Sequence, residues 1–89
     1  MITPENLLSH ELVGLHATIL CASQRKLVGL SGTIIFETKN MITIKVGSRH
    51  KRISKIVARR IKLHLPGNVC FISGVSLIGR PEDRVLRYP

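Results

Sequence analysis

Short β-type segments separated by turn residues dominate this sequence from Leu27 onward. Within residues 41–46 the apolar side chains Ile42, Ile44 and Val46 recur at every second position, which is the period of a half-buried strand. No long helix separates these segments. Closely spaced short strands with glycine at the bends favour one small antiparallel barrel, an architecture that also removes exposed sheet edges.

The other expected elements follow from the same alternation and from capping residues. Thr3-Pro4-Glu5 indicates a helix start, because threonine caps free N–H groups and proline fits the first helical position. Residues 80–84 place proline and acids at a second helix start, and Gly74 is expected at a bulge or sharp bend of the barrel. We expect strands over residues 16–21, 33–37, 41–46, 52–57, 60–65 and 69–73. The chain, 1–89, is then one domain with a helical segment over 1–14, a barrel over 15–79 and a helical segment over 80–89.

Composition limits the class of protein. The 89 residues suit one domain, and 44% apolar residues with a mean hydropathy of +0.19 supply a packed core. A chain of this length buries roughly 60–65% of its unfolded surface, so a binding partner can stabilise it appreciably. No apolar run approaches the roughly 18 residues of a membrane span, and the first residues lack the features of a signal peptide. We therefore expect an intracellular, cytoplasmic protein with no membrane partner.

The residues that support catalysis or metal binding in other proteins are scattered here. Cys21 and Cys70 lie far apart without CxxC or Cys/His spacing, so we expect buried free thiols, with a disulfide as the alternative, and no zinc site. Phosphodiester cleavage with metals needs clustered carboxylates. The acids are instead spread over Glu5, Glu11, Glu37, Glu82 and Asp83, and no metal-ligand spacing links His10, His16, His50 and His64. We expect no catalytic residue, no metal and no cofactor in this chain.

Charge is the strongest functional signal. Lys and Arg outnumber Asp and Glu by 14 to 5, which gives a net charge of +9 and a pI near 10.6. Residues 38–81 contain no acid. A single lysine is ordinarily a solvated surface residue, but concentrated like charges repel, so a polyanionic partner is indicated: nucleic acid before an anionic membrane or an acidic protein. The basic run consists of Arg49, Lys51, Arg52, Lys55, Arg59, Arg60 and Lys62.

Aromatic content bears on how nucleic acid is bound. Proteins that bind single strands stack bases on aromatic side chains, and the aromatic residues here are Phe36, Phe71 and Tyr88. Both phenylalanines lie in strand patterns, where core packing is expected. The composition therefore favours phosphate contacts and recognition of RNA shape over base stacking.

Three segments of the sequence are similar to a known signature. They are residues 10–15 (HELVGL), residues 30–40 (LSGTIIFETKN), and Gly74 followed by residues 80–84 (RPEDR). In order and spacing they resemble the archaeal ribonuclease P protein component 1 family, over roughly residues 7–86. The resemblance implies a mainly β fold: a small Sm-like antiparallel β-barrel of five to seven short strands with short helical N- and C-terminal segments.

The resemblance also implies a function. Members of this family are protein subunits of the ribonucleoprotein that removes the 5′ leader from precursor tRNA. The RNA subunit holds the catalytic centre and its Mg²⁺, and the protein is a non-catalytic subunit that supports the active RNA fold. The implied partners are the ribonuclease P RNA, a zinc-ribbon protein subunit, the other holoenzyme proteins and precursor tRNA.

Site residues follow from the same resemblance. The implied RNA contacts are Arg25, Lys26, Arg49, Lys51, Arg52, Lys55, Arg59, Arg60, Lys62, Arg80, Arg84 and Arg87. The implied apolar patch for the zinc-ribbon protein is Leu7, Leu8, Leu12 and Val13.

Three other functions remain open from the sequence. A ribosomal or other small-barrel RNA-binding protein has the same size and charge, and would cofractionate with ribosomal subunits. A basic adaptor that binds an acidic protein would keep its partner after nuclease treatment. A nuclease in its own right would cleave RNA with metal as the purified chain, and the scattered acids argue against it.

Overall fold

The computed structural model describes residues 11–79, which form six antiparallel strands and two short 3-10 helices. The strands are β1 (His16–Ala22), β2 (Ser31–Glu37), β3 (Met41–Val46), β4 (Arg49–Ser54), β5 (Ala58–Leu65) and β6 (Asn68–Ile72). The 3-10 helices are η2 (Arg25–Leu27) and η3 (Gly74–Leu77). The mainly β expectation is confirmed. Of the two expected helical ends, residues 1–10 and 80–89 lie outside the described residues, and residues 11–14 form no helix. No helix of residues 11–79 is long and apolar enough to cross a membrane.

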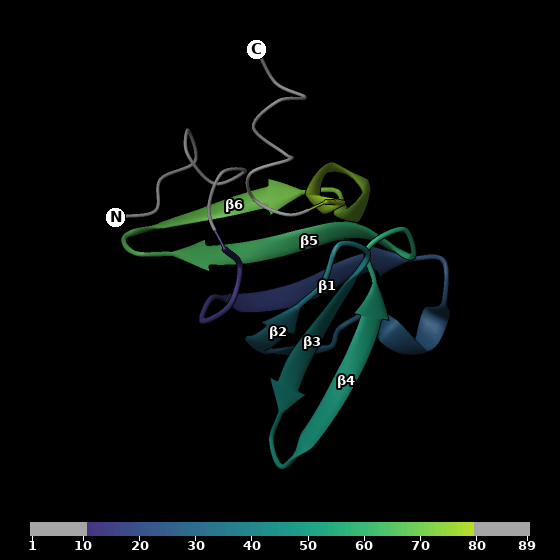
Figure 1. Cartoon of the computed structure of the whole chain (residues 1–89), viewed down its shortest axis with the longest axis horizontal. Helices are drawn as coiled ribbons and strands as arrows, with labels where there is room; N and C mark the ends of the chain where they lie inside the picture. Colours follow the sequence, from purple (N-terminus) through teal and green to yellow (C-terminus); the bar gives the residue numbers. More distant parts are fainter. Residues whose placement is uncertain (1–10, 80–89) are drawn as a thin grey trace.

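The strands form one curled sheet with the order β4-β3-β2-β1-β5-β6 (Figure 1). Every neighbouring pair is antiparallel. Strand β1 pairs on one side with β2, which follows it in sequence, and on the other side with β5, which is distant in sequence. The two outer strands, β4 and β6, do not pair with each other. The expected barrel is therefore open, with hydrogen-bonding edges left at β4 and β6.

One expected strand is shifted by three residues. We predicted a strand over 52–57 after a four-residue turn, but the turn contains just Gly47 and Ser48, so Arg49 already pairs with Val46. Gly47 has a φ of +63°, a left-handed conformation that glycine adopts without steric cost. The strand ends at Ser54, whose carbonyl accepts a turn hydrogen bond from the Val57 amide.

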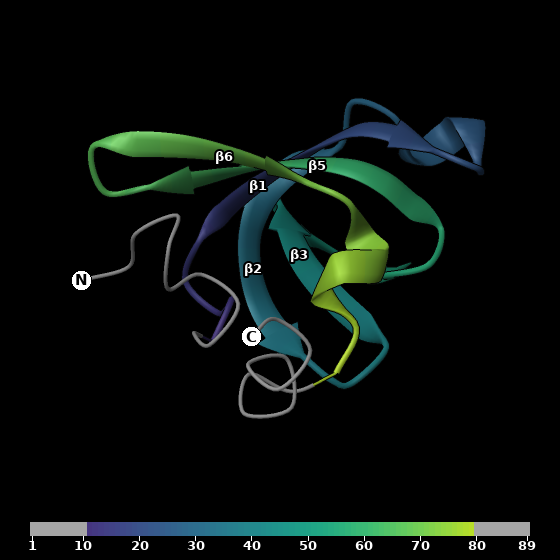
Figure 2. The ribbon, with the colours of Figure 1, turned by 90° about the horizontal axis from the view of Figure 1, so that it is seen from above.

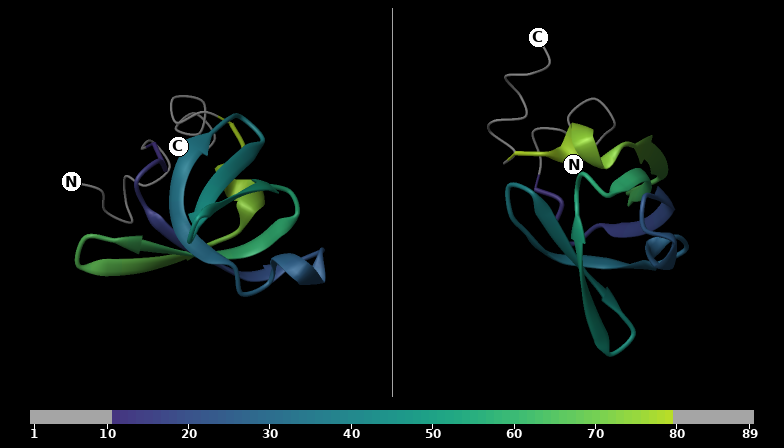
Figure 3. Two further views of the ribbon diagram at one scale, coloured as in Figure 1. Left: turned by 90° about the horizontal axis from the view of Figure 1, so that it is seen from below. Right: turned by 90° about the vertical axis from the view of Figure 1, so that its right-hand side faces the viewer.

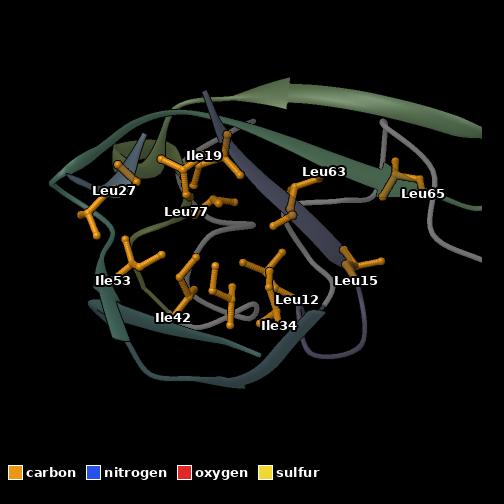
Figure 4. Close-up of a cluster of buried hydrophobic side chains, with 14 residues drawn as sticks. Leu12, Leu15, Ile19, Leu27, Ile34, Ile42, Ile53, Leu63, Leu65 and Leu77 are labelled. Atoms are coloured by element: carbon orange, nitrogen blue, oxygen red, sulfur yellow. The ribbon is translucent and has the colours of Figure 1, made fainter. Parts of the chain in front are cut away.

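The core fills the concave side of the curl (Figure 4). Alternate residues of the strands point inward, as in Ile42 and Ile44 of β3 and Ile61 and Leu63 of β5, and all four are fully buried. Leu77 of η3 is also fully buried. The period-2 pattern in the sequence thus identified the inward face of β3 and β5 correctly.

Gly74 allows η3 to pack closely against the connection between β4 and β5 (Figures 2 and 3). A Cβ atom at this position would overlap the backbone carbonyl oxygens of Lys55 and Ala58. Gly74 begins η3 just after β6 and forms no bulge in a strand, so of the two expected alternatives, a bulge or a sharp bend, the bulge is wrong. The register shifts lie elsewhere, between Ile19 and Ala22 of β1 and between Ile34 and Phe36 of β2.

Candidate nucleic-acid interface

The basic run divides between two strands that are not neighbours. Arg49, Lys51 and Arg52 lie on β4, whereas Arg59, Arg60 and Lys62 lie on β5. In the sheet, β3, β2 and β1 separate these two strands. The run therefore contributes to two different parts of the surface rather than to one continuous stripe.

The first part is the β3–β4 arm, the hairpin of β3, β4 and the turn between them, which projects away from β5 and β6 (Figures 1 and 3). Arg49 and Lys51 pair with Val46 and Ile44 and share their face, whereas Arg52 pairs with Thr43 on the opposite face. All three cations are exposed. The arm thus presents positive charge on both of its faces.

A pocket of about 420 Å³ lies between η2 and β4, and we refer to it as the basic pocket. Lys26 of η2 lines it together with Lys51 and Arg52 of the arm. The remaining lining residues are polar Gln24 and Ser54 and apolar Leu27, Leu30, Met41 and Val57. Residues distant in sequence therefore bring three cations to one concave site. Arg25, the preceding residue of η2, is exposed and does not line the basic pocket.

The second part of the basic surface lies on β5. The pairing of β1 with β5 moves from Cys21↔Arg60 to Ala22↔Ala58, so Arg59 is an extra residue on β5. Such a bulge interrupts the alternation of faces, and Arg59 and Arg60 are both exposed. The Arg60 guanidinium carbon lies 5.7 Å from the centre of the Phe71 ring, within the range of a cation–π contact.

Lys55 is not available to RNA, which corrects one of the implied contacts. Its side chain is fully buried, and Nζ donates to Glu37 Oε2 at 2.7 Å and to the carbonyl oxygen of Thr38 at 2.8 Å. Further bonds at 3.2 Å run from Nζ to the carbonyl oxygens of Lys39 and Gly79. A buried ammonium needs such partners because its desolvation is costly. The role of Lys55 is internal.

The implied apolar patch changes as well. Leu12 is fully buried in the core, so it is not a surface residue for a partner protein. Its amide donates to Glu37 Oε1 at 3.1 Å, which fixes this segment beside the Lys55 ion pair. Val13 is 43% exposed and stays in the prediction. The other implied members of the two surfaces, Leu7, Leu8, Arg80, Arg84 and Arg87, lie outside the described residues.

Two sequence expectations about side-chain burial are wrong. Phe36 and Phe71 are 60% and 50% exposed, although both were expected to pack in the core. Both thiols are free, as expected, but neither is buried, since Cys21 is exposed and Cys70 is partly exposed. The aromatic surface available to a ligand is thus larger than the sequence indicated.

Negative charge is sparse around these cations. The acids of the described residues are Glu11 and Glu37, and Glu37 is ion-paired to Lys55. No group of three or more His, Cys, Asp or Glu within residues 11–79 is arranged to hold a metal ion. Residues 11–79 thus carry far more positive than negative charge, a balance that suits an anionic ligand.

Comparisons with known proteins agree with the fold and with the sequence resemblance. The family model described as ribonuclease P/MRP, subunit p29, matches residues 5–87. Ribonuclease P protein component 1 of Methanococcus aeolicus is 43% identical over 89 residues, with 98% of this chain and 92% of the relative covered. The Thermofilum pendens protein of the same name is 44% identical over 88 residues, covering 97% and 93%.

A solved structure is similar too. Mth11, described as a homologue of the human RNase P protein Rpp29, superimposes with a TM-score of 0.61 at 32% identity. The match covers 84% of this chain and 97% of Mth11. Sequence family, relatives and structure converge on one assignment. The chain belongs to the ribonuclease P/MRP subunit p29 family.

Proposed function

We propose that this chain is an RNA-binding, non-catalytic protein subunit of ribonuclease P, the endoribonuclease that removes the 5′ leader from precursor tRNA. The relatives are named as protein components of ribonuclease P, which supports the proposal that this chain is a subunit of that complex. The observation that carries RNA binding is the convergence of Lys26, Lys51 and Arg52 on the basic pocket. No acid of the described residues lines that pocket, so phosphates are its natural ligands.

The proposed mechanism is electrostatic. Each Lys or Arg that contacts a phosphate releases condensed counterions, and this release contributes to the binding free energy. Neutralised phosphates repel one another less, so the folded RNA needs less Mg²⁺ to hold its catalytic core together. Mg²⁺ in this proposal belongs to the RNA and no catalytic step is assigned to the chain.

The proposal divides the surface between two partners. The β3–β4 arm, the basic pocket and the exposed cations of β5 are assigned to the ribonuclease P RNA. Val13, with Leu7 and Leu8, is assigned to the zinc-ribbon protein subunit. The hydrogen bond from the Leu12 amide to Glu37 supports this second assignment, because it fixes the backbone directly before Val13 to the folded sheet.

The test is the salt dependence of binding to the ribonuclease P RNA, measured by fluorescence anisotropy with the full chain. We expect the logarithm of the affinity to fall linearly with the logarithm of salt concentration. Lys51→Gln should lower the magnitude of this slope by roughly 0.7–0.9, the effect of one lost phosphate contact. An affinity that hardly changes from low to moderate salt contradicts the phosphate-contact mechanism.

Lys39→Gln is the matched control. Lys39 is exposed on the turn between β2 and β3, does not line the basic pocket, and its substitution removes the same charge. The slope should stay within error of the unsubstituted protein. Equal effects of Lys51→Gln and Lys39→Gln would show that net charge, rather than the basic pocket, governs binding.

A further inference from the structure

Phe71 lies on the convex face of the sheet with half of its side chain exposed. It pairs with Lys62 of β5, and Lys62 pairs with Thr18 of β1, so these side chains point to the same face. A single exposed apolar residue is common on protein surfaces and needs no special explanation. The surroundings of Phe71 are what distinguish it.

Two cations flank the Phe71 ring. The Arg60 guanidinium lies over the ring at 5.7 Å from its centre, and Lys62 stands directly across the strand pair. The only acids between residues 11 and 79 are Glu11 and Glu37, and Glu37 is held by Lys55. An aromatic surface between cations suits a ligand that has both a flat ring and negative charge.

Hydroxyl groups continue the row beyond Lys62. Thr18 pairs with Ser31 of β2, and the two hydroxyl oxygens are 2.9 Å apart. Ser31 Oγ also lies 2.8 Å from His16 Nε2. Because neighbouring strands are about 4.8 Å apart, the four-strand row from Phe71 to Ser31 is about 14 Å long. We name the residues Phe71, Arg60, Lys62, Thr18 and Ser31 the Phe71 row.

We propose that the Phe71 row binds an unpaired RNA base by stacking it on Phe71, while Arg60 and Lys62 hold the phosphates beside that base. Thr18 and Ser31 then face the ribose of the adjoining nucleotide. The inference rests on the proposed function, since it requires that the chain binds RNA, and it adds the class of RNA recognised: a single-stranded loop, bulge or end rather than duplex phosphates alone. Stacking is available to every base because each has a flat aromatic face.

An apolar protein surface is the competing ligand for an exposed phenylalanine. The charge around the ring favours RNA, because Arg60 and Lys62 would have to be desolvated against such a surface, and no acid among residues 11–79 forms an ion pair with either of them. Against RNA, the same two side chains gain phosphate partners.

The experiment compares two RNA probes, a short single-stranded oligonucleotide and a duplex of equal charge, against the full-length chain. Phe71→Leu should weaken binding to the single strand about 5- to 150-fold, which is the conversion of one lost stacking contact. The salt slope should stay unchanged, since no cation is removed, and duplex binding should be affected little. Phe71→Trp should retain the single-strand affinity because it keeps an aromatic face.

Val69→Ala is the control. Val69 lies on the same strand and face as Phe71 and is 42% exposed, so its truncation tests for a general effect of losing apolar surface. Thermal melting of each variant checks that the fold is kept. We expect single-strand affinity equal to that of the unsubstituted protein.

Three outcomes overturn the inference, and they are distinguishable. If the unsubstituted chain binds RNA and Phe71→Leu binds equally well, stacking is refuted while the proposed function stands. If Phe71→Leu binds RNA normally but loses a protein subunit of the holoenzyme, the Phe71 row is a protein interface. If the unsubstituted chain binds neither probe nor the ribonuclease P RNA, the proposed function fails and stacking fails with it.

Discussion

Lys55 shows how one residue within a basic run can have a role opposite to that of its neighbours. Its ammonium is buried and bonded to Glu37 and to carbonyls at 39 and 79, so it connects the turn after β2 with the end of the described chain. Removing one partner of a buried ion pair leaves an uncompensated charge, which costs more than the pair itself contributes. The stability of this fold should therefore depend strongly on both residues.

We predict that Lys55→Met lowers the free energy of unfolding by about 3–5 kcal/mol, because the buried Glu37 carboxylate then loses its ammonium partner. Urea denaturation followed by circular dichroism measures this change. Adding Glu37→Gln should recover part of the loss, since glutamine is neutral and still accepts from the Leu12 amide. Lys39→Met, at an exposed site, should change the free energy of unfolding by less than about 0.5 kcal/mol. A stable Lys55→Met protein would contradict the internal role of Lys55.

Cys21 provides a chemical reporter beside the proposed RNA surface. It is exposed and pairs with Arg60, whereas Cys70 is partly covered. We predict that a maleimide labels Cys21 faster than Cys70, and that bound RNA slows the labelling of Cys21. Cys21→Ser and Cys70→Ser assign the two rates. Equal labelling of Cys21 with and without saturating RNA would place the RNA away from β5.

The burial of Lys55 had a signal in the sequence that the charge pattern obscured. Lys55 is two residues after Ile53, so the expected strand over 52–57 places both on one face, and Ile53 is indeed in the core. In the structure β4 ends at Ser54, and Lys55 is buried in the turn that follows. Phe71 had no such signal, because residues 69–72 are all apolar and no alternation separates the two faces. Its outward direction follows from pairing with Lys62, and pairing register cannot be obtained from one strand alone.

At the scale of the elements, the hairpin of β2 and β3 could be predicted, whereas the bulges could not. The bulge between Ile34 and Phe36 shifts the alternation by one residue, so Ile34 points into the core and Phe36 is exposed on the same strand. A second bulge exposes Arg59 and Arg60 together. Both irregularities depend on the neighbouring strand, so a single-strand pattern does not reveal them.

The packing of η3 leads to a prediction at this scale. Gly74→Ala should destabilise the fold by about 1–3 kcal/mol, because the added methyl would overlap the carbonyl oxygens of Lys55 and Ala58 and push η3 outward. Thermal and urea unfolding measure the loss. Val75→Ala, on the same helix but 55% exposed, should change stability by less than about 0.5 kcal/mol. Equal stability of the two variants would refute close packing at Gly74.

At the scale of the whole molecule, the sequence indicated a small antiparallel barrel and a basic surface, and the strand order explains what it did not indicate. The basic residues that are close in sequence lie on two strands that are not neighbours in the sheet. The chain passes directly from β4, an outer strand, to β5, which pairs with β1. Lys26 joins the basic pocket although it lies outside the run. Both features result from connections across the sheet, and no local pattern encodes them.

The net charge of +9 makes salt act in opposite directions on the free protein and on its complex. Like charges destabilise the compact state, and added salt screens them, so the free chain should melt at a higher temperature at moderate than at low salt. Bound RNA neutralises the same charges and should stabilise the fold by about 2.7 kcal/mol when free RNA is at 100 times Kd. That stabilisation should shrink as salt weakens binding. Melting curves of the free chain and the complex should therefore approach each other as salt increases. In the variant Lys51→Gln/Arg52→Gln, the melting curves of the free chain and of the complex should already be closer together at low salt. A separation between the two curves that stays constant at all salt concentrations would mean that RNA is held mainly by contacts other than phosphates.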